Sequence, residues 1–112
     1  MLTQDQKNQL NPLTLHPKFG RLLTEAIKTW ETMTPKQRTF CDDTMNNCCL
    51  VGASVLNDYI LSSNWKSAVT LASEKFTGYE VVTVSDGFDN EPSYEDEGYN
   101  FGKAVSDIVL GK

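Results

Sequence analysis

The residues best equipped for chemistry are six carboxylates in one short polar stretch of the 112-residue chain. They are Asp86, Asp89, Glu91, Glu95, Asp96 and Glu97. An EF-hand calcium loop needs glycine at its sixth position, whereas loops counted from Asp86 and Asp89 have Glu91 and Tyr94 there. Carboxylates crowded in a polar turn also stay ionised, while a general acid needs burial to raise its pKa. We therefore expect a solvated turn without metal or cofactor, and a calcium site of another kind stays open.

The second candidate chemistry is nucleophilic catalysis by a thiol. The chain has three cysteines, Cys41, Cys48 and Cys49, and a single histidine, His16. The spacing is wrong for zinc, and an odd count argues against a closed disulfide framework. A catalytic thiol needs a base within hydrogen-bond reach, and nothing in the sequence assembles that pair. The pattern predicts buried thiols; the alternative is a small enzyme that uses Cys48, Cys49 or a carboxylate pair within residues 86–97.

Charge is distributed unevenly along the chain. Residues 1–75 contain eight Lys or Arg and seven Asp or Glu, a net charge of +1. Residues 76–112 contain two Lys and eight Asp or Glu, a net charge of −6, which gives −5 for the whole chain. An acidic surface argues against direct nucleic-acid binding, which needs cationic side chains. It favours a protein partner with a basic surface.

The predicted docking surface is the turn at residues 86–97 and the start of the helix that follows. Its carboxylates would attract a cationic partner and make association sensitive to salt. Aromatic side chains lie among them, and tyrosine is enriched in interface cores; for Phe88, burial in the protein core is the alternative. The predicted partner-binding residues are Phe88, Asp89, Glu91, Tyr94, Glu95, Glu97 and Tyr99.

These residues must be positioned by a core, and residues 46–56 are its predicted centre. The segment carries no charge, and its apolar positions continue to Leu61. This length and pattern predict a buried helix over residues 47–61. Gly52 costs about 1 kcal/mol relative to alanine inside a helix. We expect close packing against a neighbouring helix to offset that cost.

Helical periodicity is clearest over residues 17–33, where apolar side chains recur every three or four positions. Thr34 and Gln37 flank Pro35 at the spacing of a capping box, which predicts the start of a second helix. Residues 1–15 are polar with scattered leucines. We expect them to form a loosely ordered, extended arm.

A further helix is expected from about residue 65 to residue 76, where the apolar side chains again follow a helical period. Residues 79–84 are short and rich in β-branched side chains, so they predict a strand or an extended segment. A lone strand is unstable. It would pair with residues 8–15 or across an oligomer, or pack as extended chain.

The last predicted helix has Ser93 as its cap, with Asp96 at the capping-box distance. Gly98 and Gly102 lie inside it and are expected to weaken it. Gly111 is placed to end it. The predicted fold is thus mainly α, a single domain over residues 1–112 with four to five helices around the segment 47–61.

Residues 49–53, Cys-Leu-Val-Gly-Ala, lie in a predicted helix, and Asp89-Asn90 precede a capped helix. This arrangement resembles small uncharacterised bacterial and phage proteins that pair a Cys-Leu-Gly-Ala helix with a later Asn-Asp turn. Val51 interrupts the first motif, and the turn dipeptide is reversed. The resemblance implies a compact helical accessory protein and transfers no mechanism.

The expected function is that of a non-enzymatic, acidic protein-interaction module. One form would be a phage or plasmid accessory or inhibitor protein that binds the basic face of a host protein. The start of the chain has neither the basic residues nor the apolar centre of a signal peptide. No apolar run is long enough to span a bilayer. We therefore expect a cytoplasmic protein without membrane contact, and homo-oligomerisation stays open.

Overall fold

The computed structural model describes residues 2–37, 39, 50–62, 68–76, 84, 86–88 and 96–111, and these residues form mainly helices. The helices are α1 (Gln4–Leu10), the 3₁₀-helix η1 (Asn11–Leu15), α2 (Gly20–Thr32), α4 (Leu50–Ser54), α5 (Leu56–Leu61), α6 (Ala68–Lys75) and α8 (Glu97–Val109). Residues 35–37 and 86–88 are also helical, and no described residue lies in a strand. The predicted mainly α fold is therefore confirmed. The Cα radius of gyration of 12.9 Å matches the value of about 13 Å expected for a compact chain of this length.

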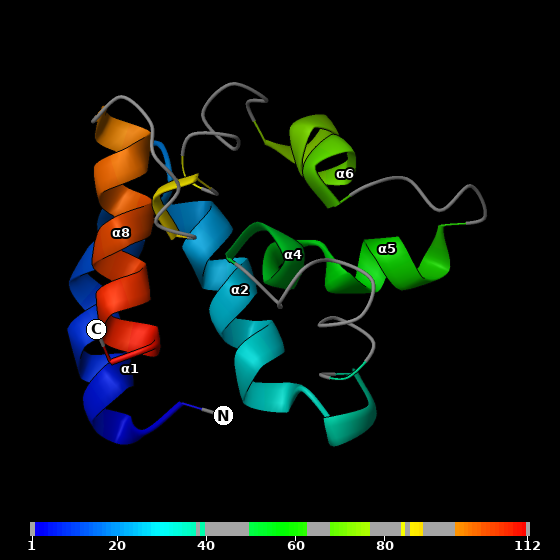
Figure 1. Ribbon diagram of the computed structural model, residues 1–112, viewed down its shortest axis with the longest axis horizontal. Helices are drawn as coiled ribbons and strands as arrows, with labels where there is room; N and C mark the ends of the chain where they lie inside the picture. The colour runs from blue at the N-terminus through cyan, green and yellow to red at the C-terminus, as the bar shows by residue number, and fades with distance from the viewer. Residues whose placement is uncertain are drawn as a thin grey trace.

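Helix α2 forms because its apolar side chains share one face. Leu22, Leu23, Ala26 and Trp30 are buried on that face, which packs against α4 (Figure 1). Thr34 and Gln37 then form the predicted capping box: the Thr34 N–H donates to Gln37 Oε1 at 3.0 Å, and the Gln37 N–H donates to Thr34 Oγ1 at 3.1 Å.

The predicted central helix over residues 47–61 is buried only in part and is not one helix. Residues 47–49 lie outside the described part of the chain, and Ile60 and Leu61 are exposed. Every residue from 50 to 56 is buried, yet the helix breaks at Val55, whose φ is −125° and ψ is 12°. Two local bonds explain the break. Ser54 Oγ donates to the Val51 carbonyl at 2.7 Å, and the Val55 N–H bonds to the Gly52 carbonyl three residues back at 3.3 Å. Such bonds tighten the last turn of a helix and compete with its regular ladder.

The N-terminal segment is helical, so the prediction of an extended arm over residues 1–15 is wrong. Thr3 caps α1, and Thr3 and Gln6 form a complete capping box. Leu10 is buried in the core. Gln6 Nε2 also donates to the carbonyls of Ile108 and Val109, each at 3.3 Å, and Figure 1 shows α1 beside the C-terminal end of α8. The capping and these tertiary contacts order a segment whose own sequence is mostly polar.

Helix α8 begins at Glu97, whereas the predicted cap at Ser93 would start the helix at residue 94. Asp96 is the actual cap, because its Oδ1 accepts a hydrogen bond from the Tyr99 N–H at 2.8 Å. Phe101 and Val105 face the core. Gly111, with a φ of +69°, follows the helix as predicted, in the left-handed region that favours glycine.

Two glycines allow α8 to approach the helical residues 86–88 very closely. A Cβ on Gly102 would lie 2.1 Å from the Val84 carbonyl oxygen, and a Cβ on Gly87 would lie 2.0 Å from the Tyr99 carbonyl oxygen. Gly52 is itself buried in α4, the helix that packs against α2; its own close contact stays a prediction. Val84, the last residue of the predicted strand 79–84, is helical and buried; residues 79–83 lie outside the described part of the chain.

On the other side of α2, α6 is attached through its C-terminal end. Arg21 Nη2 donates to the Lys75 carbonyl at 2.8 Å, and the guanidinium lies 4.7 Å from the centre of the Phe76 ring. Lys75 Nζ in turn lies 3.9 Å from carboxylate oxygens of both Glu25 and Asp58. These contacts join α2, α5 and α6. Among the described residues, no helix has the length and apolar character needed to cross a bilayer.

Candidate functional site

Four of the seven predicted partner-binding residues, Asp89, Glu91, Tyr94 and Glu95, lie outside the described part of the chain, as do the three cysteines. Phe88 and Tyr99 are only 5% and 8% exposed. Phe88 stacks on Trp30 of α2 with ring centres 6.3 Å apart. Both side chains are therefore buried in the described structure. For Phe88 this is the alternative given by the sequence, and partner binding by Phe88 and Tyr99 stays a prediction.

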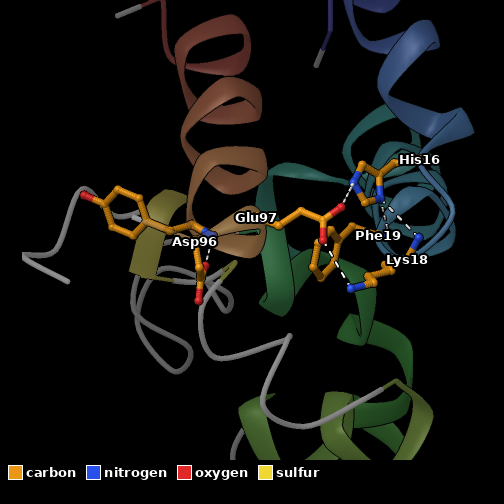
Figure 2. A network of polar contacts seen from close by, with 6 residues as sticks. His16, Lys18, Phe19, Asp96 and Glu97 are labelled. Carbon is orange, nitrogen blue, oxygen red and sulfur yellow. Dashed lines mark hydrogen bonds and ion pairs between the residues drawn. The ribbon is translucent and has the colours of Figure 1, made fainter. Parts of the chain in front are cut away.

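Glu97 is the one predicted site residue that is described and exposed. It occupies the first turn of α8 and reaches across to the turn that precedes α2 (Figure 2). Its Oε1 lies 3.0 Å from His16 Nε2, and its Oε2 lies 3.2 Å from Lys18 Nζ. We call these three side chains the His16–Lys18–Glu97 cluster. It joins residues that are about eighty positions apart in the chain.

His16 uses both of its ring nitrogens in this cluster. Nδ1 accepts hydrogen bonds from the backbone N–H groups of Lys18 at 3.1 Å and Phe19 at 3.2 Å. An accepting Nδ1 carries no proton, so the neutral ring must carry its proton on Nε2 and donate it to Glu97. These two N–H groups lie just before α2, where helical backbone bonds cannot satisfy them.

Aromatic packing fixes the plane of the His16 ring. Its centre lies 4.9 Å from the ring of Phe19 and 5.2 Å from the ring of Phe101, which it meets edge-on. The two phenylalanines are themselves 5.3 Å apart. The ring therefore lies against two core side chains, and Glu97 receives a donor with a defined direction.

The cluster favours the ionised form of Glu97. The hydrogen bond from Lys18, supported by the positive charges of Lys18 and of His16 when protonated, holds the pKa of the Glu97 carboxyl below its ordinary value of 4.5. A carboxylate that stays ionised while exposed is suited to binding cations and basic groups. It is not suited to donating a proton.

The contacts of the two His16 nitrogens are relevant to the alternative of a small enzyme that uses a cysteine thiol. His16 is the only histidine in the chain, and its two nitrogens face backbone amides and Glu97. A general base needs a free nitrogen directed at the nucleophile, and in this arrangement neither is free. Within the described ranges, no three metal-ligating side chains come together.

In the sequence, His16 was a candidate base only, and its hydrogen bonds with the N–H groups before α2 were not predicted. The sequence does contain a signal for the contact between His16 and the start of α2, because His16 precedes Pro17 and a segment with clear helical periodicity. The sequence contains no signal for the contact between His16 and Glu97, because no spacing rule links the first turn of one helix to a loop about eighty residues earlier. No protein-family model, curated protein or solved structure matches the chain.

Proposed function

We propose that this protein is a non-enzymatic interaction module whose acidic C-terminal third binds a partner protein with a basic surface. The observation that carries the proposal is the charge segregation, −6 on residues 76–112 against +1 on residues 1–75. Such a distribution directs a cationic partner to one part of the molecule and speeds encounter.

The described residues on either side of segment 89–95 support this function. Phe88 is held by its stacking on Trp30, and Asp96 is held by its hydrogen bond to the Tyr99 backbone. Both ends of the acidic segment are therefore attached to the same helical body. A segment with anchored ends loses less conformational entropy on binding than a free tail.

The carboxylates Asp89, Glu91 and Glu95 supply the electrostatic part of the recognition. With Phe88 and Tyr99 buried, Tyr94 is the aromatic residue of the acidic segment left to contact the partner. Charge-dominated association weakens as salt screens it. One biological form of this function is a cytoplasmic phage or plasmid accessory protein that masks the nucleic-acid-binding face of a host factor.

The test compares two variants with the same change of net charge. The first replaces the acidic segment's carboxylates by amides: Asp89→Asn, Glu91→Gln and Glu95→Gln. The control replaces three exposed carboxylates of the body: Asp5→Asn, Glu31→Gln and Glu74→Gln. The partner is first identified by cross-linking and capture from the source cell, and the dissociation constant of each variant is then measured at low and at physiological salt.

We expect the acidic-segment variant to bind about tenfold or more weakly at low salt and to show a shallower salt dependence. The control should stay close to the unmodified protein. Equal affinity and equal salt dependence for all three proteins would exclude the acidic segment as the binding surface.

A further inference from the structure

The His16–Lys18–Glu97 cluster contains a conflict that depends on protonation. The Nδ1 atom of His16 accepts from two backbone N–H groups, which requires a lone pair. A protonated imidazole carries hydrogen on both nitrogens and accepts at neither. The cationic ring therefore cannot keep the contacts with Lys18 N–H and Phe19 N–H.

Protonation has the opposite effect on the contact at Nε2, which it strengthens. Nε2 faces the Glu97 carboxylate at 3.0 Å, and a cationic ring strengthens that contact to a charge-assisted hydrogen bond. Glu97 from α8 and Lys18 from the turn are the charged groups that the structure places at the ring. Asp96, the neighbouring carboxylate, is directed to the Tyr99 N–H, and Phe19 and Phe101 provide the uncharged walls.

We propose that His16 is a proton-sensitive latch between the start of α2 and the start of α8. With a neutral ring, His16 binds both: Nδ1 holds the amides before α2, and Nε2 holds Glu97. Binding a proton leaves the ring attached to Glu97 and releases the amides of Lys18 and Phe19. The change takes place when the ring binds its second proton.

The turn between η1 and α2, which protonation would release, packs closely against the neighbouring backbone. The Gly20 N–H bonds to the His16 carbonyl at 3.0 Å, and a Cβ on Gly20 would lie 2.1 Å from the Thr14 carbonyl oxygen. A shift of the turn is therefore transmitted to η1, whose last residue, Leu15, is 83% exposed. The latch would make the presentation of this apolar side chain depend on pH.

The single histidine allows a direct test by nuclear magnetic resonance. The ring ¹⁵N shifts of the unmodified protein should show the tautomer with hydrogen on Nε2 at neutral pH. On acidification, the amide signals of Lys18 and Phe19 should move with the same midpoint as the ring. Their hydrogen exchange, corrected for pH, should speed up by about tenfold, the effect of losing one hydrogen bond.

Two variants separate the latch from other titrations. In His16→Asn, the side-chain Oδ1 lies near the position of Nδ1 and accepts from the same amides without titrating, so the pH response of both amides should disappear. In Glu97→Gln, the response should persist, because Gln Oε1 still accepts from Nε2. Circular dichroism confirms first that each variant is folded.

A ring with hydrogen on Nδ1 at neutral pH would overturn the proposal, and that measurement needs no variant. Amides of Lys18 and Phe19 that ignore the titration of the ring would overturn it as well. So would an unchanged amide response in His16→Asn.

Discussion

Replacing Gly102 of α8 by alanine should destabilise the protein, although alanine is the better helix former. The new Cβ would lie 2.1 Å from the Val84 carbonyl oxygen and 2.8 Å from the Phe88 backbone nitrogen. Ordinary Cβ contacts begin at 3.4 Å, so α8 and the helical residues opposite it would have to move apart. Both of the opposing atoms belong to the main chain, and no rotamer change can relieve the overlap.

Two opposing effects set the size of the change in the free energy of unfolding. Overpacking a core costs about 1–3 kcal/mol, and a clash against backbone belongs at the upper end of that range. Exchanging glycine for alanine inside a helix returns about 1 kcal/mol. The net loss is about 2 kcal/mol. At about 2 cal/mol/K of unfolding entropy per residue, it lowers the melting temperature by roughly 9 °C.

The assay is thermal unfolding followed by calorimetry, with Asn100→Ala as the matched control. Asn100 is exposed on the same helix, so alanine there should raise stability by about 0.5 kcal/mol through helix propensity alone. Gly87→Ala should destabilise the protein like Gly102→Ala, and the double variant should lose less than the sum because both act on one crossing. If Gly102→Ala melts at or above the unmodified protein while Asn100→Ala behaves as expected, the crossing is not tight.

Three further predictions concern other contacts of α8. Gln6→Glu replaces the amide that donates to the last carbonyls of α8 by a negative charge. It should lower the free energy of unfolding by about 1–2 kcal/mol, measured by urea titration. The control Gln4→Glu, on the same helix, should have little effect. Because folding lowers the pKa of Glu97, its ionised form stabilises the protein above pH 4.5, and this contribution disappears as the pH falls through the lowered pKa. The stability difference between the unmodified protein and Glu97→Gln should therefore be larger just above pH 4.5 than below the lowered pKa of Glu97, and a difference that does not change across that pH range would refute it. Ser106 Oγ is buried and, within the described part of the chain, has no hydrogen-bond partner, so Ser106→Ala should leave stability unchanged or raise it by up to about 1 kcal/mol; a clear loss in thermal unfolding would show that the hydroxyl is bonded.

Local patterns in the sequence predicted what depends on local chemistry. The period of apolar residues in α2 and the capping box of Thr34 and Gln37 needed only neighbouring positions, and both are confirmed. Thr3 and Gln6 carry the same capping signal, but it was overlooked because α1 is short and has no apolar period. The helix there depends on partners in α8 that no local pattern reveals.

Long-range contacts could not be read in the same way. A glycine in a sequence shows that a backbone can approach, but not which backbone does. Gly102 was therefore expected only to weaken its helix, whereas Gly102 and Gly87 lie where α8 closely approaches the backbone of Val84 and Phe88. Tyr99 was expected at the surface because acidic residues surround it in sequence, and for Phe88 burial was left open; both side chains are buried.

The contacts at the two ends of α8 come from one N-terminal segment. Gln6 binds the last carbonyls of α8, and His16 and Lys18 bind Glu97 in its first turn. Residues 6–18 therefore run antiparallel to α8 and hold both ends of a helix that is 13 residues, or about 20 Å, long. This helix is itself part of the acidic C-terminal third, and Asp96 caps it. The N-terminal segment therefore holds α8 at both of its ends. Of the acidic C-terminal third, the described residues 96–109 are thus attached at both ends to the start of the chain.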